Sequence, residues 1–185
     1  MRVKVLAAAQ LFADFGLDAT RMEDVATTTG VPKATLYYYF DGKEDLLAFL
    51  FAEILDEVER AIRGAVDGGG TAADRLRAAI VAHLGVFEAF PAASRALQFD
   101  LGRAARIPLI DQRTDAAFLG PVRELLEAGV ADWTLRSVAH PRVAAVAILG
   151  AVTTVGINAV TAGPTRPIED IADDVIGVVL HGVAA

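Results

Sequence analysis

The sequence predicts an all-α fold, in which an N-terminal three-helix domain of the helix-turn-helix type precedes a larger helical domain. Three observations support this prediction. Apolar residues recur every three or four positions along most of the 185 residues, no stretch alternates convincingly like a strand, and glycine or proline separates the periodic segments. A content of 54% hydrophobic and 22% charged residues is enough for a core of good size and excludes a disordered or fibrous chain.

The N-terminal segment predicts three short helices. Apolar positions at i, i+3, i+4 and i+7 form the first, which Gly16 is well placed to end in a left-handed conformation. Thr20 and Glu23 have the spacing of a capping box and start the second helix. Gly30 ends it and opens a tight Gly-Val-Pro turn, with Pro32 suited to the first position of a third helix over about residues 33–40. This arrangement is typical of helix-turn-helix domains.

The third helix lies in the stretch GVPKATLYYYFDGKEDL and carries three consecutive tyrosines. At about 100° per residue, Leu36 and Phe40 share the side that fastens the helix to the core. Tyr38 lies on the opposite side, and Tyr37 and Tyr39 lie on the flanks. Helical aromatic residues are often simply core, which accounts for Phe40 and for part of Tyr37. Three adjacent tyrosines span about 200°, however, and cannot all point inward.

The outward side of this helix carries only small or polar-tipped side chains, so it can approach a DNA major groove about 12 Å wide. Tyrosine and threonine hydroxyls suit phosphate contacts, and Lys33 and Lys43 add positive charge where a DNA backbone would pass. The predicted DNA contacts are nine side chains in and around the helix: Thr20, Arg21, Lys33, Ala34, Thr35, Tyr37, Tyr38, Tyr39 and Lys43.

The rest of the chain predicts further helices. A fourth begins after Asp41, with acidic residues in its first turn, and continues to Gly64 before a flexible glycine triplet. Others are predicted at about residues 71–90, 92–105, 115–131 with a kink at Pro121, 141–162 and 167–183. We expect the DNA-binding domain to comprise residues 1–46 and a ligand-binding and dimerisation domain to comprise residues 47–185.

The middle helices predict an apolar pocket with few polar anchors, which suits a small-molecule ligand. His83 is an isolated polar residue on an apolar helix face, which more often marks a satisfied core histidine than a ligand contact. Arg103 suits an acidic ligand or simply an ion pair with Asp100. The candidate ligand contacts are His83, Phe87, Phe99, Arg103, Phe118, Trp133 and Asn158.

The last two helices predict a dimer interface. The helix at 167–183 has an apolar stripe opposite acidic residues, and the nearly chargeless helix at 141–162 has more apolar surface than a monomer needs. Pairing both with their symmetry mates would make a four-helix interface. The segment at 143–162 is also long enough to span a bilayer, but it contains Asn158 and lacks an aromatic belt, so a helix buried on most sides is favoured.

Charge and composition restrict the other functional classes. A net charge of −7 argues against a protein that coats nucleic acid through bulk electrostatics, so any DNA contact has to be local. The absence of cysteine fits a reducing compartment, and the first residues lack the apolar region of a signal peptide, so we expect a cytoplasmic protein.

Nothing in the sequence favours an enzyme. The three histidines lie far apart in sequence, Ser94 and Ser137 lack the context of a catalytic nucleophile, and the glycine triplet lacks the lysine of a phosphate-binding loop. We therefore expect no cofactor, no metal site and no catalysis, although folding could bring distant groups together.

The N-terminal fifty residues resemble the DNA-binding signature of the tetracycline-repressor-like (TetR) bacterial transcription regulators. The matching positions are Leu11-Phe12, Gly16, Thr20, Val25-Ala26, Gly30-Val31, Thr35-Leu36-Tyr37, Tyr39-Phe40, Lys43-Glu44 and Leu46-Leu47. The resemblance implies a homodimer whose recognition helices enter successive major grooves, with a ligand-binding domain that controls their spacing.

Together these observations predict a TetR-like transcription regulator, a repressor that a small, largely apolar ligand releases from a palindromic operator. Two alternatives remain open. One is a dimeric helical small-molecule-binding protein without DNA-binding activity, which is plausible because residues 1–46 carry five basic and seven acidic side chains. The other is a helical enzyme.

Overall fold

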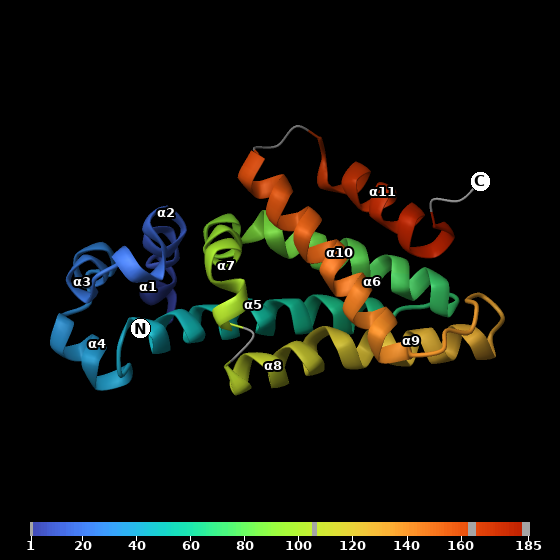
Figure 1. Ribbon diagram of the computed structural model, residues 1–185, viewed down its shortest axis with the longest axis horizontal. Helices are drawn as coiled ribbons and strands as arrows, with labels where there is room; N and C mark the ends of the chain where they lie inside the picture. Colours follow the sequence, from blue (N-terminus) through green and yellow to red (C-terminus); the bar gives the residue numbers. More distant parts are fainter. Residues whose placement is uncertain (1, 105–106, 163–165, 183–185) are drawn as a thin grey trace. The chain divides into compact units, whose positions relative to one another are not determined.

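The computed structural model describes residues 2–104, 107–162 and 166–182, with only the backbone at 2, 3 and 99–104. Within these residues the chain is helical and contains no strand, which confirms the predicted class (Figure 1). The elements are α1 (Arg2–Leu6), α2 (Ala9–Ala19), α3 (Met22–Thr29), α4 (Lys33–Tyr39), α5 (Lys43–Val66), α6 (Ala72–Ala89), α7 (Pro91–Ala104), α8 (Pro108–Thr114), the π-helical segment η1 (Asp115–Leu119), α9 (Gly120–Ala131), α10 (Pro141–Ala162) and α11 (Ile168–His181).

The helices form two compact units. The first contains residues 1–54 and 90–112, and the second contains residues 55–89 and 113–185. The predicted boundary after residue 46 falls inside α5, a continuous helix that contributes to both units. The division into domains 1–46 and 47–185 therefore stays a prediction.

In the first unit, α2 packs against α7, and Phe12 and Leu17 are buried. The backbone of α2 leaves the helical conformation at Gly16, where φ is +70°, so this glycine interrupts the helix where the sequence predicted a left-handed end. The predicted capping box was wrong. Arg21 precedes α3 without a side-chain cap, while the Thr20 hydroxyl donates to the carbonyl of Gly16 at 2.7 Å.

The turn between α3 and α4 is held by its own hydrogen bonds. Gly30 adopts the left-handed conformation with φ +64° and ψ +21°, which few side chains tolerate. The Thr29 hydroxyl donates to the Val25 carbonyl at 2.7 Å and accepts from the Val31 amide at 3.2 Å. Pro32 lies one position before the helix rather than at its first residue, and its carbonyl accepts from the Leu36 amide. The sequence-based helix-turn-helix is therefore confirmed in its backbone.

In the second unit, α6 packs against α9, α10 and α11. The ring of Phe87 on α6 lies against Gly156 on α10, where a Cβ atom would stand 2.4 Å from a ring carbon. A glycine at this position lets the two helices approach closely.

Two helical segments differ from the sequence-based prediction. Helical structure precedes residue 115, because α8 leads directly into η1 and α9. In the π turn, the Gly120 amide donates to the Asp115 carbonyl, and this wider turn comes directly before Pro121, where a kink was expected.

The second difference concerns α10, which is long and apolar enough to cross a membrane by length and composition. Only 28% of its most apolar window is buried, although we expected burial on most sides. Ala145, Ile148 and Val152 face the core, while Val143 and Val146 are exposed. One side of α10 thus has no partner among the described residues.

Candidate nucleic-acid interface and ligand pocket

The tyrosines of α4 point outward, as their spacing predicted. Leu36 is fully buried and Phe40 is 8% exposed, so these two side chains hold the helix to its unit. Tyr38 is 82% exposed, Tyr39 58% and Tyr37 50%, and the Tyr38 and Tyr39 rings meet edge to face at 5.0 Å. Phenol groups that do not contribute to the core are free to contact a partner.

Lys33 at the start of α4 forms an ion pair with Glu23 of α3, and its ammonium lies 5.7 Å from the centre of the Tyr37 ring. The hydrogen bond to Lys33 lowers the pKa of Glu23, and the same bond raises the pKa of Lys33. Both side chains are exposed, so the pair adds little stability and can open when another anion approaches.

Two other predicted DNA contacts have partners inside the unit. The Lys43 ammonium donates to the carbonyl of Asp18 at 2.8 Å, near the C-terminal end of α2, where positive charge is favourable. Thr20 is 2% exposed, and its hydroxyl already donates to Gly16. Arg21 and Ala34 are exposed and Thr35 is half-buried, so these three remain accessible.

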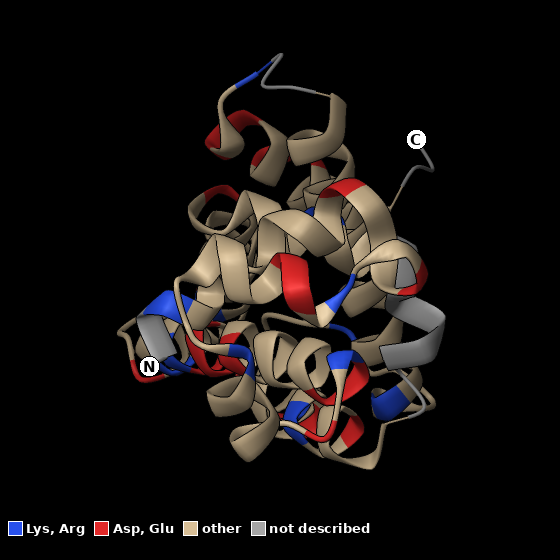
Figure 2. Ribbon diagram, turned by 90° about the vertical axis from the view of Figure 1, so that its left-hand side faces the viewer, with Lys and Arg blue, Asp and Glu red and all other residues tan. Residues whose placement is uncertain are grey.

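Charges of both signs surround this helix-turn-helix. Figure 2 shows Lys and Arg positions interleaved with Asp and Glu positions along the ribbon. The interleaving agrees with the acidic balance of residues 1–46, and it means that attraction to a polyanion has to come from a few well-placed groups.

Three predicted ligand contacts lie together in the second unit. The His83 ring centre is 5.3 Å from that of Phe87 and 4.9 Å from that of Phe118, and all three side chains are buried. His83 Nδ1 has no hydrogen-bond partner among the described residues. Burial lowers the pKa of His83 to about 4, because an imidazolium ion would lose its hydration there. We call these residues the His83 cluster.

Two of the other four predicted ligand contacts, Trp133 and Asn158, do not join this cluster. Trp133 is 93% exposed with φ +63°, and Asn158 is exposed on α10. Phe99 and Arg103 are on α7 in the first unit, and their side chains lie outside the described residues.

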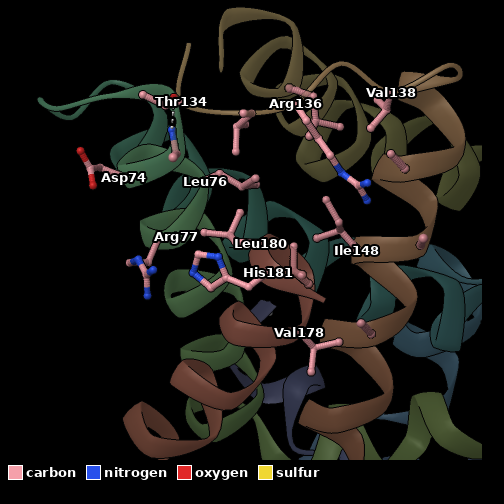
Figure 3. Close-up of a pocket in the computed structure, with 17 residues that line it drawn as sticks. Asp74, Leu76, Arg77, Thr134, Arg136, Val138, Ile148, Val178, Leu180 and His181 are labelled. Carbon is pink, nitrogen blue, oxygen red and sulfur yellow. Dashed lines mark hydrogen bonds between the residues drawn. The ribbon is translucent and has the colours of Figure 1, made fainter. Parts of the chain in front are cut away.

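A pocket of about 600 Å³ lies in the second unit, among α6, α9, the connection from α9 to α10, and α10 and α11 (Figure 3). Its wall is mostly aliphatic, and its charged or titratable lining residues are Asp74, Arg77, Arg136 and His181. The sequence did not reveal this pocket, because its residues come from segments far apart in the chain.

Hydrogen bonds between distant segments hold one rim of the pocket. The Ala72 amide at the start of α6 donates to the carboxylate of Asp132 at 2.8 Å, and the Ala73 amide donates to the Thr134 hydroxyl at 3.3 Å. The first amides of α6 are thereby satisfied. Within the described part of the chain, no three potential ligands gather into a metal site.

Family models match both parts of the chain. "Bacterial regulatory proteins, tetR family" matches residues 5–50, and "Tetracyclin repressor-like, C-terminal domain" matches residues 69–183. The HTH-type transcriptional repressor KstR2 of Rhodococcus jostii is 28% identical over 183 residues, which cover 96% of this chain and 88% of that protein. The HTH-type transcriptional regulator RutR of Escherichia coli is 44% identical over 50 residues, which cover 27% of this chain and 24% of RutR.

Solved structures share the whole fold. FadR from Bacillus subtilis, in complex with stearoyl-CoA, superposes with a TM-score of 0.86 at 20% identity and full coverage of both chains. KstR2 from Mycobacterium tuberculosis, described as a ketosteroid transcriptional regulator, superposes with a TM-score of 0.75 at 23% identity, covering 100% of this chain and 95% of that one.

Proposed function

The chain belongs to the TetR family of bacterial regulatory proteins and is a DNA-binding transcription regulator, and from this premise we propose that it is a repressor. In this proposal, a small and largely apolar molecule releases it from a palindromic operator. The KstR2 relative is itself a repressor, which supports the sign of regulation. An operator on chromosomal DNA would place the protein in the cytoplasm.

We propose that α4 reads the operator through its exposed side. The observation that supports this most directly is the exposure of Tyr37, Tyr38 and Tyr39 on a helix whose Leu36 is fully buried. The proposed contacts are Arg21, Lys33, Ala34, Thr35, the three tyrosines and Lys43. Thr20 is left out because its buried hydroxyl already donates to Gly16.

Replacement of two hydroxyls tests this interface. An operator would first be selected from random duplex DNA, and the double variant Tyr38→Phe, Tyr39→Phe would then be compared with the wild type by fluorescence anisotropy. Loss of two hydroxyl hydrogen bonds to the DNA per subunit, from Tyr38 in the groove and Tyr39 on the flank, should weaken binding about tenfold or more. Trp133→Phe, an exposed aromatic change in the second unit, is the control and should bind normally. Unchanged affinity of the double variant at an intact dimer would exclude these hydroxyls as contacts.

We propose that the homodimer forms through α10 and α11. Val143 and Val146 on α10 and Val178 on α11 are exposed apolar side chains, and the exposed side of α10 has no partner among the described residues. A symmetric pair of such surfaces would make an interface in which each subunit contributes the same residues.

We propose that the His83 cluster contacts the effector. A buried polar atom without a partner is costly unless a ligand or water satisfies it, and the Nδ1 atom of His83 is in this position. The structure of FadR contains stearoyl-CoA, which has a long apolar chain, so acyl-CoA thioesters are suitable first probes. If His83→Phe responds to such a probe as the wild type does, the effector does not bind at this cluster.

The acidic N-terminal segment supports one alternative to the repressor, a dimeric helical small-molecule-binding protein that does not bind DNA. Lys33 and Lys43 have partners within their own unit, which reduces the charge available to phosphates. Selection from random DNA separates the two functions: a palindromic motif supports the repressor, and no enrichment at any salt concentration supports the alternative.

A further inference from the structure

The pocket of about 600 Å³ in the second unit is a site separate from the His83 cluster. None of His83, Phe87 and Phe118 lines it. Its volume lies within the range of small-molecule sites. Its aliphatic wall, which includes Leu76, Leu135 and Ile148, would bind an apolar body.

The charged side chains that line the pocket are two arginines and one carboxylate, Asp74, and His181 adds an imidazole. Arg77 comes from α6, Arg136 from the connection between α9 and α10, and His181 from the last residue of α11. Figure 3 shows Arg136 reaching from this connection towards Ile148. Within the described residues, Arg136 makes no hydrogen bond and no ion pair. In a chain with a net charge of −7, two arginines against one carboxylate give this pocket a positive balance.

Hydrogen bonds from Thr71 and the charge of Arg77 lower the pKa of Asp74, so that carboxylate is a partner for Arg77. Arg136 has no such acidic neighbour among the described pocket residues. The Asp74 carboxylate accepts hydrogen bonds from the Thr71 amide at 3.0 Å and the Thr71 hydroxyl at 2.7 Å, so it caps α6. Asp132 and Thr134 already satisfy the next amides of that helix. An incoming anion would therefore meet the guanidinium groups rather than free backbone amides.

We propose that this pocket binds an amphipathic anion, with a carboxylate or phosphate group held by Arg136 and an apolar body packed against Leu76, Leu135 and Ile148. A guanidinium group binds either kind of anion through paired N–H donors. Arg77 adds a second positive charge to the pocket wall, and the imidazole of His181 offers one further donor or acceptor there.

Trp133 provides a direct readout of binding. It is the chain's single tryptophan, it is exposed, and it directly precedes Thr134 in the pocket wall. Full-length protein without DNA would be titrated with decanoate, decyl phosphate and the uncharged decan-1-ol. Tryptophan fluorescence and titration calorimetry would be recorded in parallel.

We expect at least one of the two anions to bind about tenfold or more tightly than decan-1-ol, because the alcohol lacks the charge-assisted hydrogen bonds. The stronger of the two anions identifies the headgroup. Arg136→Gln should remove most of this preference, Arg136→Lys should restore part of it, and Arg77→Gln should reduce it less. Arg63→Gln, which removes an exposed arginine of α5 that pairs with Glu59, is the matched control and should behave as the wild type.

Three results would overturn the assignment: equal affinity for the anions and decan-1-ol, an unchanged preference in Arg136→Gln, or loss of anion binding in His83→Phe with retention in Arg136→Gln. The third result would mean that the anion binds at the His83 cluster and not in this pocket. Circular dichroism verifies that each variant is folded. Because no DNA is present, failure here leaves the proposed operator binding untouched.

Discussion

His83 is a polar side chain in an apolar environment, between the rings of Phe87 and Phe118. Its neighbours offer no hydrogen bond to Nδ1 within the described residues and no opposite charge that lowers the cost of protonation. The pKa near 4 therefore means that the folded protein holds this imidazole neutral at pH values where an unfolded chain would protonate it.

This difference predicts a loss of stability in acid. Between about pH 6.5 and 4 the unfolded state binds a proton that the folded state does not, so stability falls as the pH falls. The full effect of one buried histidine is about 3 kcal/mol. Urea unfolding at pH 7.5 and pH 5 should show a smaller difference for His83→Phe than for the wild type. Equal differences in the two proteins would mean that His83 does not set the acid sensitivity.

Single residues also mark where prediction from sequence succeeds. The orientation of Tyr38 followed from helical geometry alone, since a short helix fixes the angle between Tyr38 and the buried Leu36. The partner of Lys43 could not be predicted, because Asp18 lies 25 residues away and only the packing of the unit brings them together.

At the scale of elements, the distance between α10 and α6 depends on Gly156, a small residue at the contact of the two helices. A Cβ atom on residue 156 would stand 2.4 Å from the Phe87 ring, which is itself buried. The ring cannot move aside without disturbing the His83 cluster, so the helices would have to separate.

We therefore predict that Gly156→Ala destabilises the protein by about 1–3 kcal/mol, even though alanine favours a helix more than glycine does. Gly85→Ala on α6 is the matched control, since a Cβ there has nothing within 4 Å. The control should be neutral or stabilising in thermal unfolding. A stabilised Gly156→Ala variant would contradict the close packing of α6 and α10.

The helix boundaries show why elements are only partly predictable. Gly30 ended α3 as expected, because a left-handed residue after a helix is a strong local signal. The helix before residue 115 was missed, since the seven residues of α8 are too few for an apolar repeat that stands out. The π turn before Pro121 depends on packing and has no simple sequence signature.

At the scale of the whole molecule, the exposed side of α10 leads to a prediction about the dimer. Val146→Glu should convert the dimer to a monomer, because each subunit would bury a carboxylate in an apolar symmetric interface. Operator binding should fall with it. The control is Val130→Glu on α9, where a valine is similarly exposed outside α10 and α11. Light scattering measures the mass, and a dimeric Val146→Glu protein would exclude this interface.

The pocket shows the limit of prediction at this scale. Helical periodicity indicated which residues face a core, but the pocket joins residues from Ala73 to His181. The Ala72–Asp132 hydrogen bond alone connects positions 60 residues apart. Such sites depend on tertiary packing. The sequence therefore predicted an apolar domain but not which arginines line its pocket.

The continuity of α5 has a mechanical consequence. Its 24 residues make a rod about 36 Å long, with no proline and with its single glycine, Gly64, near the far end. Helices bend sharply mainly at proline, glycine or π turns, so this rod has no joint along most of its length. A tilt of only about 5° displaces one end by about 3 Å relative to the other. A small tilt of α5 is therefore amplified into a larger displacement at its ends, one of which is Lys43.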